Sequence, residues 1–349
     1  MKFTIIGAGA IGGVLGAYLI KAGYKVTFFD IDEEHVKEMN HGGLTIEGPD
    51  EIFTVRCNAL TPNQLESANP ELETVFLCVK AQHTEKALEP FLPFIKKETN
   101  VVSIQNGLCE KMIVPLIGRE KTIGCFVNFS ADYLAPGKIL YGGVASLYIG
   151  ELDGTISRRV KELQKALLSW GPAEITENIW GYLWGKMSYA GLLYATALVD
   201  ETMATVVRQL EFRETLIELC AEILEVCNKE GVFPLGFDDW EPSLIYPREK
   251  QNEKELAAQL EKLATRMAEN KKTKSGIWRD LAIRKRKTEI DAQLVPILRI
   301  GANHGLEMPL TSLLVNLIKQ IETGSLQMGW ENLTRLKQMY ESGEKYVKS

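Results

Sequence analysis

Lys2-Phe3-Thr4-Ile5-Ile6-Gly7-Ala8-Gly9-Ala10-Ile11-Gly12 decides the fold of the first half of the chain. A strand-like run ends at Ile6, and the Gly-x-Gly-x-x-Gly pattern after it opens a helix. In such a turn the glycines allow a tight bend, close approach of the backbone to a pyrophosphate, and close packing of helix on strand. The N–H groups at the start of the helix attract phosphate. We therefore expect Gly7, Gly9, Ala10, Ile11 and Gly12 to hold a dinucleotide; a glycine turn without a ligand is the alternative.

Asp30 follows the second predicted strand, Lys25–Phe29, and lies eighteen positions after Gly12. That spacing is close to the ~20 residues expected for the acidic residue that binds the ribose of a dinucleotide. A carboxylate there accepts a hydrogen bond from the 2′-OH of NAD and repels the 2′-phosphate of NADP. The sequence therefore predicts NAD(P)H as cofactor, with NAD(H) favoured because of Asp30. Asp30 could also, or instead, cap a helix that begins at Asp32 or Glu33.

Strand-like and helix-like runs alternate through residues 1–176, which predicts a Rossmann-type, doubly wound parallel sheet. Further strands are expected at Thr74–Val79, Val101–Ile104, Thr122–Phe126 and Ala173–Ile175. Short runs separated by Pro136-Gly137 and Gly142-Gly143 are expected to be antiparallel edge strands; they are Asn128–Tyr133, Lys138–Tyr141 and Ser146–Ile149.

Residues 177–349 carry almost no strand signal, and their helical periodicity predicts an all-helical carboxyl-terminal domain. The fold class is therefore α/β, a Rossmann domain at 1–176 followed by a helical substrate or catalytic domain at 177–349. The stretch Asn178–Val199 has one charged residue, Lys186, and we interpret it as a buried helix of a soluble protein rather than a membrane span.

Composition excludes several classes of function. The net charge of −6 and pI near 5.5 argue against a nucleic-acid partner. The six cysteines form no Cys-x-x-Cys pair, and no signal peptide precedes the first strand, so we expect a reduced, cytoplasmic protein without membrane attachment. The four histidines have no companions at metal-ligand spacing, so no metal is expected.

Lys186 is the only charged residue between Glu177 and Asp200. A buried ammonium is costly unless it is paired, and burial moves its pKa toward neutrality, which suits a proton donor to a forming alkoxide. The alternative is a lysine whose ammonium reaches water from the edge of the helix.

Four segments together resemble the ketopantoate reductase family: Gly7–Gly12, Cys78-Val79-Lys80-Ala81, Ile104-Gln105-Asn106-Gly107 and Thr288-Glu289-Ile290-Asp291. The resemblance covers nearly the whole chain and implies nicotinamide-dependent reduction of a small 2-oxo acid to a 2-hydroxy acid. By motif it implies that Lys186 is the general acid and that Glu289 is a carboxylate near it. It also implies that Asn106 and Lys80 line the nicotinamide and substrate region.

The chain departs from the family pattern where the substrate would be held. The family has asparagines four and eight positions after its lysine, where this chain has Ala190 and Tyr194. Ser275 is the nearest match to the family's substrate-binding serine, and Tyr194 is expected to line the substrate pocket in place of a missing asparagine. These changes predict a substrate that is bulkier or less polar than ketopantoate.

Simpler roles remain open for the other residues. Asn106 could serve only the Asn-Gly turn, Lys80 could be a solvated strand end, and Glu289 could lie on a solvated, mixed-charge helix. An opine-type or β-hydroxyacid dehydrogenase fits the same plan, and so does a non-catalytic NAD(P)-sensing regulator. The oligomeric state is also open, with a homodimer as one option.

Overall fold

The first strand and helix form where the glycine-rich segment predicts them. In the computed structural model, which describes residues 1–269 and 272–347, β1 (Lys2–Ile6) leads through the glycine turn into α1 (Ala10–Lys21). Strand β2 (Lys25–Phe29) then lies parallel to β1. The chain forms two compact units, Met1–Ile179 and Trp180–Ser349.

The first unit is built on an eight-stranded sheet with the order β12-β11-β8-β7-β6-β1-β2-β5. Its remaining strands are β5 (Asn58–Leu60), β6 (Thr74–Leu77), β7 (Asn100–Ser103), β8 (Thr122–Val127), β11 (Leu147–Glu151) and β12 (Ala173–Ile175). All neighbouring strands are parallel except β11 and β8. Strand β1 has β2 on one side and β6 on the other, so the strand order reverses there. Ligands of such sheets gather at the carboxyl ends of the strands at this reversal.

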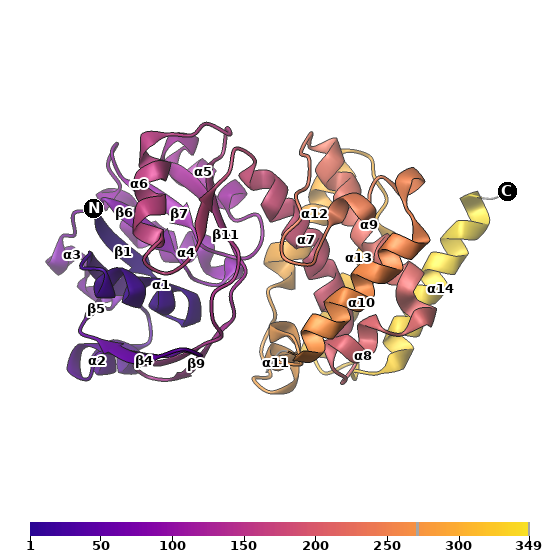
Figure 1. Cartoon of the computed structure of the whole chain (residues 1–349), viewed down its shortest axis with the longest axis horizontal. Coiled ribbons are helices and arrows are strands. Elements are labelled where there is room, and N and C mark those ends of the chain that lie inside the picture. Colours follow the sequence, from indigo (N-terminus) through magenta and orange to yellow (C-terminus); the bar gives the residue numbers. More distant parts are fainter. Residues whose placement is uncertain (270–271, 348–349) are drawn as a thin grey trace. The chain divides into compact units, whose positions relative to one another are not determined.

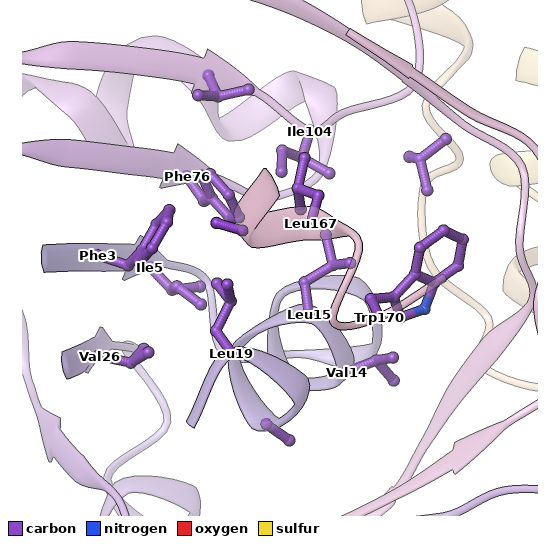
Figure 2. Packing of buried hydrophobic residues seen from close by; sticks show 14 of the residues in the cluster. Phe3, Ile5, Val14, Leu15, Leu19, Val26, Phe76, Ile104, Leu167 and Trp170 are labelled. Carbon is purple, nitrogen blue, oxygen red and sulfur yellow. The ribbon is translucent and has the colours of Figure 1, made fainter. Parts of the chain in front are cut away.

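Helices cover both faces of this sheet. Side chains of α1 and α6 (Arg158–Leu167), such as Leu15 and Leu167, join Phe3 and Ile5 in one buried cluster (Figure 2). Phe29 points to the opposite face, where its ring packs against Phe91. That face also carries α4 (Thr84–Leu88), the 3₁₀ segment Glu89–Phe94 and α5 (Glu110–Ile117). Because side chains alternate along a strand, the uninterrupted apolar runs of these strands are explained by burial on both sides.

The antiparallel edge strands expected after residue 127 are only partly correct. Strands β9 (Ala131–Ala135) and β10 (Lys138–Tyr141) belong to a second, four-stranded sheet with the order β4-β3-β10-β9. Its other strands, β3 (Leu44–Glu47) and β4 (Ile52–Val55), were not predicted, and β10 pairs parallel with β3. The run expected at Ser146–Ile149 is not an edge strand, because β11 lies between β8 and β12 in the main sheet.

The described residues of the second unit form helices and no strand longer than an isolated bridge. Figure 1 shows these helices in colours that run from pink through orange to yellow along the chain. They are α7 (Ile179–Thr196), α8 (Met203–Val207), α9 (Arg213–Lys229), α10 (Glu253–Glu269), α11 (Gly276–Ala282), α12 (Ile290–Asn303), α13 (Pro309–Glu322) and α14 (Trp330–Val347). The predicted fold class, an α/β domain followed by a helical one, is confirmed. Within residues 1–269 and 272–347, none of the helices combines the length and hydrophobicity that a bilayer crossing requires.

Candidate functional site

The three glycines of the turn have different surroundings. Gly7 has φ of +95°, where L side chains are strained, and its N–H donates to the carbonyl of Phe29 at 2.8 Å. A Cβ on Gly12 would lie 2.1 Å from the carbonyl oxygen of Gly7. A Cβ on Gly9 would meet no heavy atom of the described chain within 4 Å. The turn is therefore tightly packed at its two ends and open at Gly9, where a pyrophosphate is expected to approach the backbone.

Helix α1 presents its amino terminus next to this opening. Gly9 is the N-cap, and no side chain of the described residues caps the helix there. The first N–H groups of a helix have no partner within the helix, and the helix dipole gives this end partial positive charge. No acidic residue lies in the first turn. The residues present therefore fit the diphosphate of a dinucleotide.

Asp30 holds the glycine turn through the backbone. Its Oδ2 accepts a hydrogen bond from the N–H of Ala8 at 2.7 Å, and its Oδ1 accepts one from the N–H of Asp32 at 3.0 Å. The expectation that Asp30 caps the following helix is wrong. Helix α2 (Glu33–His41) is capped by Asp32, whose side chain accepts from the N–H of His35. Asp30 is therefore left at the carboxyl end of β2, beside the glycine turn.

The loops after β6 and β7 are connected by Gln105, for which the sequence predicts no role of its own. Its Nε2 donates to the carbonyl of Val79 at 2.8 Å and to the hydroxyl of Thr84 at 2.9 Å. Lys80, half-buried, follows Val79, and Asn106, exposed, follows Gln105. The structure thus places the loops that carry Lys80 and Asn106 at the carboxyl ends of the central strands, where the glycine turn also lies.

A buried carboxyl group lies directly after this second loop. Glu110 is 0% exposed, and neither of its carboxyl oxygens makes a well-formed hydrogen bond among the described residues. Burial raises the pKa of Glu110 to about 8. Nearby backbone N–H groups and the Ser103 hydroxyl lower this pKa, but their effect is smaller than that of burial. Glu110 is therefore protonated at neutral pH.

In the second unit, Lys186 is half-buried in the middle of α7. The loop before α10 packs closely on this helix, because the N–H of Leu235 donates to the carbonyl of Gly181 at 3.0 Å. A Cβ on Gly185 would lie 2.2 Å from the carbonyl oxygen of Leu235. The indole Nε1 of Trp240 donates to the hydroxyl of Ser188 at 3.0 Å. The helix that carries Lys186 is thus in close contact with the loop between α9 and α10.

Tyr194 and Glu289 are neighbours within the second unit. Tyr194 is 0% exposed, and its pKa is raised well above the usual value by burial first and by the charge of Glu289 second. Its hydroxyl has no well-formed hydrogen bond among the described residues. Glu289 is half-buried at the N-cap position of α12. The sequence therefore identified two residues that the fold brings together, although they are far apart along the chain.

Ser275 has a structural role in the described chain. It is buried at the N-cap position of α11, and its hydroxyl oxygen accepts a hydrogen bond from the N–H of Trp278 at 3.1 Å. A hydroxyl group that accepts one hydrogen bond still has its own proton to donate. Its capping role therefore leaves it able to bind an acceptor.

Models of one protein family match both halves of the chain. The model described as Ketopantoate reductase PanE/ApbA matches residues 3–154, and the model of its C-terminal part matches residues 178–322. A 2-dehydropantoate 2-reductase of Pyrococcus horikoshii is 26% identical over 326 residues, which are 93% of this chain and 98% of that protein. One from Pyrococcus abyssi is 28% identical over 325 residues, covering 91% and 97%.

Solved structures show the same fold. A D-mandelate dehydrogenase in complex with NADH and anilino(oxo)acetate has a TM-score of 0.78 at 22% identity, covering 93% of this chain and 99% of that one. A ketopantoate reductase of the PanE/ApbA family from Ralstonia eutropha has a TM-score of 0.76 at 24% identity, also covering 93% and 99%.

Proposed function

This chain belongs to the ketopantoate reductase family and is an NAD(P)-dependent oxidoreductase; on that premise we propose that it reduces a 2-oxo acid to a 2-hydroxy acid. The observation that carries the proposal is the glycine turn, open at Gly9 and followed by the uncapped amino terminus of α1. Gly7, Gly9, Ala10, Ile11 and Gly12 would hold the diphosphate.

We further propose that NADH is preferred to NADPH. Each oxygen of the Asp30 carboxylate already accepts one backbone hydrogen bond, and each has a second lone pair for a ribose hydroxyl. Glu33 and Glu34, both exposed, follow in the first turn of α2. A 2′-phosphate placed there would face several negative charges and no arginine of this segment.

Lys186 is proposed as the general acid. When bound, the reduced nicotinamide supplies the hydride. Lys186 would donate a proton from Nζ to the carbonyl oxygen of the substrate as that oxygen gains negative charge. We propose that Glu289 accepts a hydrogen bond from the substrate hydroxyl or from Lys186, and that Asn106 orients substrate or nicotinamide ribose through its amide. Lys80 would attract the substrate carboxylate.

The substrate is proposed to be bulkier or more aromatic than ketopantoate. Tyr194 stands where the family has an asparagine, and its hydroxyl lies near Glu289 rather than in water. Tyr189, in the middle of α7, packs its ring against Phe237 and Trp240 of the loop between α9 and α10. Aromatic surfaces favour flat apolar groups, so an aromatic 2-oxo acid fits this helix better than a polyhydroxylated one. Ser275 and Tyr194 are the proposed additional substrate contacts.

The test is to incubate the protein with NADH or NADPH and with ketopantoate, pyruvate or phenylglyoxylate in turn. The loss of absorbance of the reduced nicotinamide measures its oxidation. We expect turnover on at least one acid, a loss of at least ~100-fold in kcat for Lys186→Ala, and unchanged cofactor binding in that variant. Lys254→Ala, which changes an exposed lysine of α10, is the control. Tight dinucleotide binding without turnover on any acid would favour the sensor. Turnover that required an added amino acid would favour an opine-type dehydrogenase.

A further inference from the structure

His35 connects the glycine turn to a part of the fold that lies far away in the sequence. It lies in the first turn of α2 and is 1% exposed. Its Nε2 is 3.0 Å from the carbonyl oxygen of Ala8, inside the glycine turn. Its Nδ1 is 2.9 Å from the backbone nitrogen of Gly137, in the turn between β9 and β10. Both ring nitrogens are therefore used, and neither faces water.

The partners of His35 fix which nitrogen carries the proton. The backbone N–H of Gly137 can only donate, so Nδ1 must be the acceptor. A neutral imidazole then carries its hydrogen on Nε2, which donates to the carbonyl oxygen of Ala8. A protonated ring would have donors at both nitrogens and would lose the hydrogen bond from Gly137. The geometry thus requires the neutral, Nε2-protonated form.

This hydrogen bond completes the restraint on Ala8. The N–H of Ala8 donates to Asp30 at 2.7 Å, and its carbonyl now accepts from His35. A trans peptide is planar, and its C=O and N–H point in opposite directions. With the Ala8 carbonyl held toward His35, the N–H of Gly9 must point away from α2. His35 therefore sets the direction of a donor at the position where the turn is open.

The second sheet supports His35 from the other side. The carbonyl of Gly137 accepts from the N–H of Thr45 at 2.8 Å, which joins the β9–β10 turn to β3. The Tyr133 ring meets the His35 ring edge to face at 5.0 Å, and its hydroxyl donates to Asp32 at 3.1 Å. The short four-stranded sheet thus reaches the glycine turn through α2.

We propose that His35 is a positioning residue of the dinucleotide site, which aims the Gly9 N–H through its hydrogen bond to the Ala8 carbonyl. This inference rests on the proposed function, because it assumes that the glycine turn binds the diphosphate. His35 would not touch the cofactor itself; it acts through the Ala8–Gly9 peptide.

Two substitutions separate the two hydrogen bonds. The amide nitrogen of glutamine can occupy the place of Nε2 and donate to Ala8, so His35→Gln keeps the restraint on the turn. The amide oxygen of asparagine can occupy the place of Nδ1 and accept from Gly137. His35→Asn therefore keeps the hydrogen bond from Gly137 and loses the hydrogen bond to Ala8. His41→Asn, at an exposed position at the end of the same helix, is the matched control.

The dissociation constants of NADH are measured by quenching of protein fluorescence, and KM and kcat by turnover. His35→Asn is expected to weaken NADH binding by about five- to tenfold, the equivalent of one hydrogen bond. The KM for NADH should rise by a similar factor, with kcat at saturating NADH changed by less than about twofold. His35→Gln and His41→Asn should bind NADH as the wild type does.

Equal NADH binding by wild type and His35→Asn would overturn this inference alone, and so would equal weakening in His35→Asn and His35→Gln. A wild-type protein that binds neither NADH nor NADPH would overturn the proposed function and this inference with it. A second measurement needs no variant: NMR of the wild type with nitrogen-labelled histidine should show His35 neutral and protonated at Nε2. A proton on Nδ1 would contradict the geometry.

Discussion

Replacing Glu110 by glutamine is expected to stabilise the protein increasingly as the pH rises. In the folded chain the Glu110 carboxyl is 0% exposed, and burial raises its pKa from 4.5 to about 8. Between these two values the folded state keeps a proton that the unfolded chain releases. The contribution of Glu110 to stability is therefore fully present below about pH 4.5 and is lost as the pH rises through about 8.

The size of the effect follows from the two pKa values. Each tenfold change in proton affinity is worth about 1.4 kcal/mol, so the wild type should lose about 3 to 4 kcal/mol through Glu110 between about pH 5 and about pH 8. Glutamine has the same shape and no charge. Its buried amide has a cost of its own, on the order of 1–3 kcal/mol, but this cost does not depend on pH. The difference between the two proteins should therefore change with pH by nearly the full amount.

Urea unfolding at a series of pH values, followed by circular dichroism, measures this difference. The free energy of unfolding of Glu110→Gln, relative to wild type, should increase steadily from about pH 5 to about pH 8 and then level off. Glu66→Gln, at an exposed position of the same unit, should give a difference that is flat over the same range. A flat difference for Glu110→Gln as well would show that the buried carboxyl is already ionised at low pH and would refute the argument.

Three further substitutions test the site and its support. Gly12→Ala should lower the thermal midpoint and weaken dinucleotide binding by more than about tenfold, because its Cβ would lie 2.1 Å from the Gly7 carbonyl oxygen. Calorimetry measures the first effect and fluorescence titration the second. A variant that binds the dinucleotide as tightly as the wild type would contradict the packing argument. Asp30→Ala should reduce the preference for NADH over NADPH by about tenfold or more in kcat/KM, and an unchanged ratio would remove Asp30 from the basis of selectivity. Trp240→Phe should cost about 0.5–1.5 kcal/mol of stability through the lost hydrogen bond to Ser188, measured by urea unfolding, with no effect expected on NADH binding.

The sequence predicts local features of the Rossmann domain well because each has a short-range cause. The bounds of β1 and β2 are confirmed, since β1 is followed by the glycine pattern and β2 by Asp30. Strands β3 and β4 were missed, although Gly48-Pro49 between two runs rich in β-branched residues is a turn signal. Their sheet also depends on the pairing of β3 with β10, which are far apart in the chain. No local pattern encodes such a contact.

The candidate site also contains some residues that a local sequence pattern identifies and others that it does not. Asp30 could be identified from its spacing, whereas His35 gave no signal because its two partners, Ala8 and Gly137, are distant from it and from each other in sequence. Glu110 looked like an ordinary charged residue at the start of a helix. Its burial arises from the packing of α5 on the sheet, which composition cannot reveal.

The bridge that Gln105 makes between two loops limits how this enzyme can be redesigned. An engineer who changes the loop after β7 to admit another acid also disturbs the carbonyl of Val79, and with it the backbone next to Lys80. The two segments would have to be diversified as one block. Libraries that keep Gln105 while randomising its neighbours should yield more folded members than libraries that vary each loop separately.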